Sequence, residues 1–143
     1  MELDQDPFEL QRFVDAQEPL RQRVKAEMRA GRKSSHWMWF FFPQLRGLGK
    51  SEMAHRYGIS SLAEARAYLA HPVLGPRLRE ACQLIHDVKG RSAYQIFAHP
   101  DDVKFRSCLT LFGRAAPEDP VFAACLRKYF AGVEDQATLA LLR

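Results

Sequence analysis

The run of residues 37–43 constrains the fold of this chain more than any other stretch. Its seven residues read Trp-Met-Trp-Phe-Phe-Phe-Pro, so it offers no polar face at helical or at strand spacing. A segment that is apolar on every side is stable in water only when it is buried all round. It is also far shorter than the roughly 20 apolar residues of a membrane-spanning helix. We therefore expect the run to lie at the centre of a soluble domain, enclosed by other elements.

Those other elements are predicted to be amphipathic helices. In the clearest of them, Leu78, Cys82 and Ile85 gather on one face and charged residues lie on the opposite face. No segment keeps up the alternation of a half-buried strand, although residues 94–97 fit either a helix or a strand. Helices are expected to begin at Pro7, after Pro19, at Ser51, at Ser61, at His71, after Asp102, at Pro120 and at Asp135, with stops at Gly31, Gly58, Gly90 and Gly132. The predicted fold class is all-α, with seven or eight helices in one compact domain over residues 1–143.

Two of these helix starts carry specific capping signals. Asp6 is followed by Pro7 and Glu9, so we expect Asp6 to cap a helix whose first residue is Pro7. Ser61 and Glu64 have the spacing of a capping box, in which each side chain accepts a hydrogen bond from the backbone N–H of the other residue.

The composition is that of an ordinary globular protein. Of the 143 residues, 47% are hydrophobic and 27% are charged, which excludes the low-hydrophobicity signature of disorder. The three cysteines are an odd number without C-x-x-C spacing, and the five histidines lack the spacing of a zinc motif. We therefore expect no disulfide framework, no metal and no cofactor. The acidic start of the chain, Met1 to Asp6, is unlike a signal peptide, and a reducing cytoplasm without membrane association fits best.

Positive charge is concentrated in residues 21–50. This segment carries eight lysines and arginines and one acidic residue, in a chain of net charge +4. Four of the bases recur at three- and four-residue steps and so share one side of a helix, namely Arg21, Lys25, Arg29 and Arg32. That face is either a solvated helix surface or a place that holds phosphates. Because no nucleic-acid-binding motif accompanies it, we do not expect nucleic acid as the partner and keep it only as an alternative.

The segment around the aromatic run is the main candidate site. Lys33, His36 and Gln44 flank the run, and Trp37 and Trp39 lie within it. One interpretation is a core helix whose indole N–H groups are satisfied inside the protein. The other is an aromatic pocket with a few polar groups at its mouth, which is how many small-molecule sites are built. We predict these five residues as candidates for ligand binding.

A second candidate cluster consists of Asp101, Asp102, Lys104, Arg106, Ser107 and Thr110, of which Lys104, Arg106 and Ser107 are the predicted ligand-binding residues. On a helix, Ser107 falls one turn after Lys104 and Thr110 lies three residues further, so that a cation and hydroxyls can face one site. Asp101 or Asp102 is expected to cap this helix rather than to act as an acid or base.

Several phrases of the sequence together resemble one family. They are Asp6-Pro7-Phe8, Gly31-Arg32-Lys33-Ser34-Ser35-His36-Trp37-Met38-Trp39-Phe40-Phe41-Phe42-Pro43-Gln44, Gly47-Leu48-Gly49-Lys50-Ser51, His71-Pro72-Val73-Leu74-Gly75-Pro76-Arg77-Leu78, Asp101-Asp102-Val103-Lys104 and Ser107-Cys108-Leu109-Thr110-Leu111-Phe112. Over nearly the whole chain this pattern is similar to the domain of unknown function 1810 family, with the tryptophan-rich phrase as its specific part. The resemblance implies a mainly α-helical domain, with packing likened to armadillo-type stacks, and no established activity. Members are often labelled calpastatin, which we reject, because calpastatin-type inhibitors are disordered polar chains whereas this sequence has the apolar faces of a folding chain.

The sequence supports three hypotheses about function. The first is a non-catalytic helical module that binds a protein partner or a small anionic ligand beside the aromatic run. The second is an enzyme acting on a phosphorylated or nucleotide-like molecule of the NAD or ADP-ribose type, with His36 as acid or base and three cations that bind the anionic group, Lys33, Lys104 and Arg106. The third is nucleic-acid binding through residues 21–33. We adopt the first, because the second needs side chains to converge in one cleft and spacing alone does not establish that.

Overall fold

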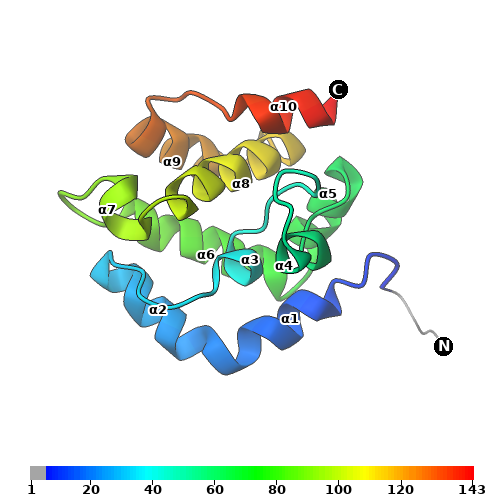
Figure 1. Cartoon of the computed structure of the whole chain (residues 1–143), viewed down its shortest axis with the longest axis horizontal. Coiled ribbons are helices and arrows are strands. Elements are labelled where there is room, and N and C mark those ends of the chain that lie inside the picture. The colour runs from blue at the N-terminus through cyan, green and yellow to red at the C-terminus, as the bar shows by residue number, and fades with distance from the viewer. Residues whose placement is uncertain (1–5) are drawn as a thin grey trace.

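All regular structure in the described part of the protein is helical. The computed structural model describes residues 6–143, and Figure 1 shows how they are arranged. Within these residues no strand forms, apart from an isolated parallel bridge between Leu45 and Ile59. The helices are α1 (Gln11–Gln17), α2 (Arg21–Ala30), α3 (Met38–Phe41), α4 (Glu52–Arg56), α5 (Leu62–Ala70), α6 (Leu74–His86), α7 (Ala93–Phe97), α8 (Asp101–Ala115), α9 (Pro120–Phe130) and α10 (Gln136–Leu142), with a 3-10 turn (Glu18–Leu20) between α1 and α2. The prediction of an all-α fold is confirmed.

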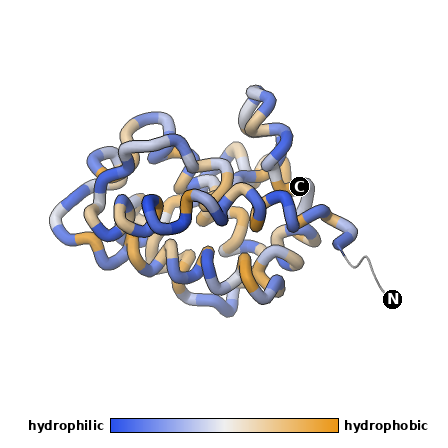
Figure 2. Tube along the Cα trace, turned by 90° about the horizontal axis from the view of Figure 1, so that it is seen from below, coloured by the Kyte–Doolittle hydropathy of each residue, from blue (hydrophilic) through white to orange (hydrophobic). Residues whose placement is uncertain are grey.

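The helices form layers around α6 and α8. In Figure 1, α1 and α2 lie along one side of the molecule, α8, α9 and α10 lie along the opposite side, and the short α3 lies between them. Helix α8 packs against α5, α7, α9 and α10, and α6 packs against α2, α5 and α9. Hydrophobic and hydrophilic residues alternate every few positions along the trace in Figure 2, as expected for helices with one buried face. The centre of the core is formed by the buried faces of α6 and α8, including Leu78, Ile85, Phe105, Leu109 and Phe112.

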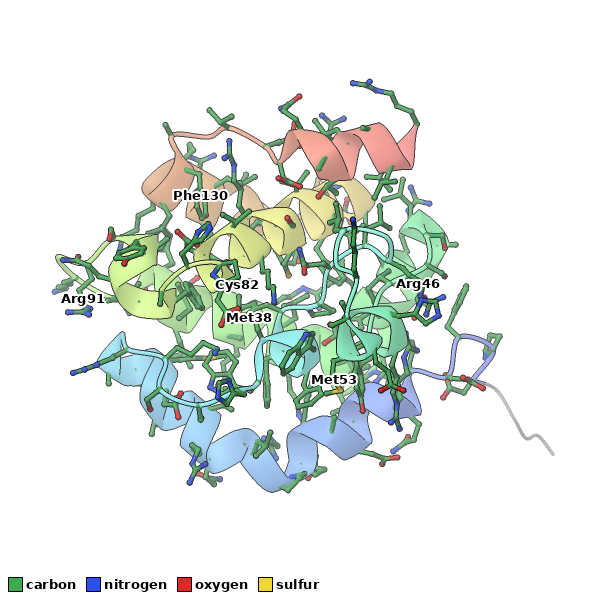
Figure 3. The ribbon with its side chains drawn as sticks, viewed as in Figure 1. Met38, Arg46, Met53, Cys82, Arg91 and Phe130 are labelled. Atoms are coloured by element: carbon green, nitrogen blue, oxygen red, sulfur yellow. The ribbon has the colours of Figure 1, made fainter. Side chains whose placement is uncertain are left out.

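The aromatic run lies in this core. Five of its residues are buried, namely Trp37, Met38, Phe41, Phe42 and Pro43. Figure 3 shows Met38 on α3, in the middle of the surrounding helices. Trp39 and Phe40 are only partly buried, which differs from the expectation of burial all round. The reason is that α3 is a single turn, which presents one side to the core and leaves these two residues at its edge.

Within residues 6–143 the number of helices exceeds the seven or eight predicted, because the short helices α3 and α7 were not expected. Helix α3 has four residues and α7 has five, and so few positions show no helical period. Helix α7 covers residues 94–97, which the sequence left open between helix and strand. A capping box settles the choice, since Ser92 accepts a hydrogen bond from the Gln95 backbone and the Gln95 side chain accepts one from the Ser92 backbone.

Helix α1 begins one turn later than predicted. Asp6 does act as a cap, but its carboxylate accepts hydrogen bonds from the backbone N–H groups of Leu10, at 2.7 Å, and Gln11, at 3.0 Å. Between Asp6 and Leu10 the chain makes a turn, in which Glu9 has a φ of 55°. The predicted start at Pro7 is therefore wrong, because the capping carboxylate reaches over this turn to a helix that begins at Gln11.

The predicted capping box at α5 forms only in part. The Ser61 hydroxyl accepts a hydrogen bond from the Glu64 N–H at 3.1 Å, as expected. The Glu64 carboxylate instead accepts hydrogen bonds from the N–H and hydroxyl of Ser60, at 2.8 and 2.7 Å, and from the Arg12 guanidinium at 2.9 Å. Glu64 is 2% exposed, so this ion pair joins α1 to α5 inside the protein.

The three cysteines are free and buried, at Cys82 on α6, Cys108 on α8 and Cys125 on α9. Burial raises the pKa of the Cys82 and Cys108 thiols well above the ordinary value. A thiol that stays protonated in an apolar interior behaves as a small hydrophobic group rather than as a nucleophile.

Two further expectations concern membranes and metals. No helix within residues 6–143 is both long and apolar enough to cross a membrane. In the same range, His, Cys, Asp and Glu side chains do not gather in groups of three or more that could hold a metal ion. Glu2 and Asp4, which contribute to the argument against a signal peptide, lie outside the described residues.

The corner between α5 and α6 generates a prediction about two glycines. A Cβ atom on Gly75 would lie 2.1 Å from the backbone oxygen of Leu69, whereas a Cβ atom on Gly113 in α8 would meet Phe122 at an ordinary 3.6 Å. Gly75→Ala is therefore expected to lower the free energy of unfolding by about 1–3 kcal/mol through overpacking. The control Gly113→Ala is expected to raise it by roughly 0.5–1 kcal/mol, because alanine favours a helix. Urea denaturation measures both, and a Gly75→Ala protein as stable as the wild type would contradict this close approach.

Candidate functional site

A concavity beside the aromatic run brings together two distant parts of the chain. It is lined by residues 33–39, which lead into α3, by residues 97–101 at the junction of α7 and α8, and by Lys104. Its volume is about 400 Å³. We call this concavity the 33/104 pocket.

The structure brings five of the eight predicted ligand-binding residues to this pocket. They are Lys33, His36, Trp37, Trp39 and Lys104. Gln44, Arg106 and Ser107 lie elsewhere. The two clusters that the sequence suggested separately thus meet through Lys104 and Asp101, which are the members of the second cluster that line this pocket.

The two lysines of the pocket share one carboxylate. The Lys33 ammonium lies 2.7 Å from Oδ2 of Asp101, and the Lys104 ammonium lies 3.7 Å from Oδ1 of the same residue. Lys33 is 8% exposed and Lys104 is 27% exposed. Lys33 is therefore a buried contact between the α2–α3 loop and α8, whereas Lys104 keeps its ammonium group partly open to the pocket.

Asp101 and Asp102 do not cap α8 as predicted. They are the first two residues of the helix, the residue before it is Pro100, and no side chain makes the capping hydrogen bond. Asp101 binds the two lysines, and the Asp102 carboxylate lies 3.0 Å from Nδ1 of His99. Acidic residues in a first helical turn are still favourable there, because the N-terminal end of a helix carries partial positive charge.

Glu27 on α2 holds the loop that forms one wall of the pocket. Its carboxylate accepts hydrogen bonds from the backbone N–H of Ser34, at 2.8 Å, from the N–H and hydroxyl of Ser35, at 3.2 and 2.6 Å, and from the Trp37 indole N–H, at 2.8 Å. Partial burial alone would raise the pKa of Glu27, but these hydrogen bonds to the charged form outweigh it and lower the pKa from 4.5 to about 2. The ionised carboxylate is thus part of the loop structure.

The two tryptophans have different surroundings. Trp37 is 1% exposed and its indole nitrogen is satisfied by Glu27, which fits the core interpretation. Trp39 is partly exposed, and among residues 6–143 its buried indole nitrogen has no hydrogen-bond partner. A buried donor without an acceptor costs about 1–3 kcal/mol. The ammonium of Lys104 lies over the Trp39 ring, 5.6 Å from its centre.

The opposite wall of the pocket contains His99 and Ala98. His99 is 65% exposed, so it stands at the mouth of the pocket, as does the exposed His36 on the other wall. Ala98 has a φ of 62° and a ψ of 173°, a backbone conformation that is strained for a residue with a Cβ atom. This conformation turns the chain sharply between α7 and α8, which brings His99 and Asp101 toward Lys33.

Gln44 lies next to a second, much smaller cavity. This cavity of about 10 Å³ shares Trp39 and Lys104 with the 33/104 pocket and is also lined by Tyr57 and Gly58. Trp39 and Lys104 therefore separate Gln44 from the larger concavity.

Arg106 and Ser107 attach α8 to the segment around α10. The Arg106 guanidinium donates to the backbone oxygen of Val133 at 2.8 Å and lies over the ring of Phe130, which Figure 3 labels at the end of α9. Ser107 is 2% exposed, and its hydroxyl lies 3.1 Å from the Asp135 carboxylate that caps α10. Ser107 does lie one helical turn after Lys104, as the spacing predicts, but α10 covers Ser107 and leaves Lys104 partly exposed.

The basic face of α2 is partly used within the fold. Lys25 pairs with Glu80 on α6 at 3.4 Å, and Arg21 is partly buried. Arg29 is exposed on α2, and Arg32 is exposed just beyond the helix, which ends at Ala30, so Arg32 is not part of the predicted helix face. Two of the four predicted bases, Lys25 and Arg21, are therefore paired or partly buried, and the other two are exposed to solvent.

Two pocket residues, His99 and Asp101, were not predicted as ligand contacts. Asp101 had a local explanation as a helix cap, and His99 stood alone before a proline. The sequence itself showed only a histidine and a carboxylate at the start of a predicted helix. That signal says nothing about which distant loop packs beside it.

The chain is similar to a family of proteins and to a protein of known structure. Residues 7–142 match the family described as "Protein of unknown function (DUF1810)". The crystal structure of the conserved hypothetical protein Rv1873 from Mycobacterium tuberculosis is similar, with 58% sequence identity and a TM-score of 0.95. The similarity covers 96% of this chain and 98% of that one. None of the curated proteins matches the chain.

The Glu27 hydrogen bonds generate a prediction with a defined pH dependence. At pH 7, Glu27→Gln is expected to lower the free energy of unfolding by about 1–3 kcal/mol, because an amide oxygen is a weaker acceptor than a carboxylate. The folded-state pKa of about 2 lies below the ordinary 4.5, so the carboxylate stabilises the protein fully above pH 4.5 and loses this effect as the pH falls through 2. The difference in unfolding free energy between wild type and variant, measured in urea, should therefore shrink from pH 4.5 to pH 2.

The matched control is Glu118→Gln, at an exposed glutamate, which should change the unfolding free energy by less than about 0.5 kcal/mol. A Glu27→Gln effect that stays constant down to pH 2 would show that the carboxylate does not hold the loop.

Proposed function

The chain belongs to the DUF1810 family of proteins of unknown function, and from the geometry of the 33/104 pocket we propose that it binds a small anionic molecule there. The observation that carries this proposal is the convergence of Lys33, His36, Trp39 and Lys104 on one concavity. Lys104 is far from the other three in the chain, so their meeting is a property of the fold and not of a single charged stretch.

The size and walls of the pocket support a small molecule. Its volume of about 400 Å³ falls in the range of small-ligand sites, which is roughly 300–1,000 Å³. Apolar wall is provided by Trp39, Met38 and Phe97, and polar groups stand at the mouth. Apolar walls with a few polar groups that orient the ligand are typical of such sites.

The charges of the pocket support an anion. Among the residues that line the pocket, two ammonium groups face the one carboxylate of Asp101, while the carboxylates of Glu27 and Asp102 are already bound to other lining residues. The N-terminal end of α8 lies at the same place and adds partial positive charge. Lys104 is the best placed contact, because it is more exposed than Lys33 and its distance of 3.7 Å to Asp101 is longer.

A phosphorylated molecule with a planar part fits these features together. The partly exposed Trp39 ring lies under the Lys104 ammonium, and the flat His36 and His99 imidazoles line the same pocket. Aromatic side chains stack on planar groups such as nucleobases, while an ammonium group binds phosphate as a point charge. A mononucleotide such as AMP is therefore a suitable probe of the site.

An enzyme acting on the same class of molecule is the second candidate. The observation that favours it is the presence of His36 in the pocket with Lys33 and Lys104, where an acid or base would be needed. Arg106, the fourth residue of that hypothesis, is engaged with Val133 instead. Product analysis after incubation with AMP distinguishes the two: turnover that is lost in His36→Ala supports an enzyme, and unchanged AMP supports binding alone.

We place this binding in a reducing cytoplasm, as the three buried free thiols support. A protein partner and a nucleic acid remain alternatives to a small ligand. They would be supported by binding that depends on the exposed Arg29 and Arg32 rather than on the pocket.

The proposal is tested by thermal unfolding with four probes: AMP, ribose 5-phosphate, inorganic phosphate and the uncharged adenosine. AMP is expected to raise the unfolding temperature, because a ligand that binds only the folded state stabilises it. Lys104→Met is expected to weaken AMP binding about tenfold or more, through loss of a charge-assisted hydrogen bond worth about 1.5–3 kcal/mol.

The matched control is Lys89→Met, which makes the same change at an exposed lysine outside the pocket. It should leave AMP binding unchanged. The proposal is refuted if none of the phosphorylated probes shifts the unfolding temperature at millimolar concentration, or if both variants weaken binding equally.

A further inference from the structure

A second group of cations gathers at the end of the molecule where α2 and α6 stop. Three parts of the chain contribute to it: the end of α2 with the residues after it, the loop between α6 and α7, and α9. Its members are Arg29, Arg32, Lys89, Arg91 and Lys128, and we call them the 29/128 strip. All are exposed except Arg91, which is partly buried and is labelled at this end of the molecule in Figure 3.

Contacts around Val88 bring the three parts together. A Cβ atom on Gly31 would lie 2.7 Å from the Val88 side chain, and the Arg91 guanidinium donates to the Gly31 backbone oxygen at 2.9 Å. The Lys128 ammonium donates to the backbone oxygen of Val88 at 2.6 Å and to that of His86. The loop between α6 and α7 therefore contacts both the end of α2 and α9, so the cations of all three parts share one surface.

Helix geometry places Arg29 on the same surface. One turn earlier on α2, Lys25 pairs with Glu80 of α6 at 3.4 Å, so this side of α2 faces α6. Arg29 follows Lys25 by four residues and therefore lies on the same side of the helix. It points toward the last turn of α6, from which the loop with the other cations begins.

The strip carries a net positive charge. Among residues 6–143, none of its five cations pairs with a carboxylate. Asp87 is exposed in the same loop, but its carboxylate accepts a hydrogen bond from Gln83. Glu27, which precedes Arg29 by two residues, binds the Trp37 loop instead. A cluster of cations that exceeds its nearby carboxylates attracts the closely spaced charges of a phosphate backbone.

Tyr94 adds an aromatic surface next to these cations. It is 63% exposed on α7, three residues after Arg91, whose guanidinium also donates to the Gln95 backbone oxygen at 2.9 Å. Cations that follow the phosphates, together with aromatic rings on which bases stack, are the usual elements of a surface for single-stranded nucleic acid. An acidic protein would use the cations without the ring, and the bases of a duplex are already stacked on one another.

We infer that the 29/128 strip binds single-stranded nucleic acid, with phosphates on its arginines and lysines and a base on the Tyr94 ring. This function goes beyond the proposed binding of a small anion and does not rest on it, because the strip lies outside the 33/104 pocket. It also differs from the basic helix face expected from the sequence. Arg21 and Lys25 take no part, and cations from the loop after α6 and from α9 join instead.

The test measures binding of a fluorescein-labelled oligo(dT) of about 12 nucleotides by anisotropy at several salt concentrations. The logarithm of the binding constant is expected to fall with the logarithm of salt, by about 0.7 for each phosphate contact. Arg32→Gln/Lys89→Gln should make this slope shallower by about 1.4, because two contacts are lost. The matched control Lys50→Gln/Arg66→Gln removes the same charge at exposed positions before α4 and on α5, away from α7 in Figure 1, and should keep the wild-type slope.

Tyr94 is tested separately, at one salt concentration. Tyr94→Ala should bind oligo(dT) about fivefold or more weakly and keep the wild-type slope, because stacking on a ring releases no counter-ions. Tyr94→Phe should bind as the wild type does, since a phenyl ring offers the same stacking surface. A role limited to the stability of α7 would leave the affinity of Tyr94→Ala for oligo(dT) unchanged.

Three results would overturn the inference: no binding of oligo(dT) to the wild type at low salt, an equal change of slope in both double variants, or wild-type affinity in Tyr94→Ala. If the last were joined by displacement of the DNA with polyglutamate, an acidic protein would be the better partner. Lys104→Met should bind oligo(dT) normally, and a loss there would place the DNA in the 33/104 pocket and contradict the inference. AMP binding is measured independently, so the proposed function can fail while this inference stands, and the reverse.

Discussion

Burial of the aromatic run between α2 and α8 is the constraint on which the rest of the structure depends. Phe42 packs edge-on against Phe105, with ring centres 5.0 Å apart, and against Phe97 at 5.9 Å, so the run joins the loop after α2 to both α7 and α8. The same loop is fastened on its polar side by Glu27, which binds the Trp37 indole. Core packing and the partly buried Glu27 carboxylate therefore hold one wall of the 33/104 pocket in place, and a preformed wall would lower the entropy lost by a ligand that binds there.

The parts of the fold that could be predicted are those determined within a few residues. Gly31 ends α2 with a left-handed φ of 70°, and Ser51 and Asp135 cap α4 and α10 by accepting a backbone N–H three residues ahead. Each signal acts over one helical turn, so the sequence contains all of it. The start of α1 was misplaced even so, because Asp6 reaches across an intervening turn.

The pocket could be predicted only as a list of residue types, because its geometry depends on contacts between distant segments. Nothing near Lys33 in the sequence indicates that Asp101 will lie 2.7 Å from it. Likewise, spacing relates Ser107 to Lys104, but only the packing of α10 determines that one is covered and the other is open. Trp37 and Trp39 also look alike in the sequence, but Glu27 on α2 accepts the indole N–H of Trp37, whereas the N–H of Trp39 has no partner among residues 6–143.

The carboxylate shared by Lys33 and Lys104 has a consequence for how charge could be exchanged at the pocket. Oδ2 of Asp101 lies 2.7 Å from the buried Lys33 ammonium, whereas Oδ1 lies 3.7 Å from the partly exposed Lys104 ammonium. An anion that enters the pocket would compete with Asp101 for Lys104 only. Lys104 could then exchange its counter-ion while the ion pair between Lys33 and Asp101 stays intact. Because Asp101 is shared in this way, Lys33 maintains the contact between the loop and α8, while Lys104 is the lysine that can bind another anion.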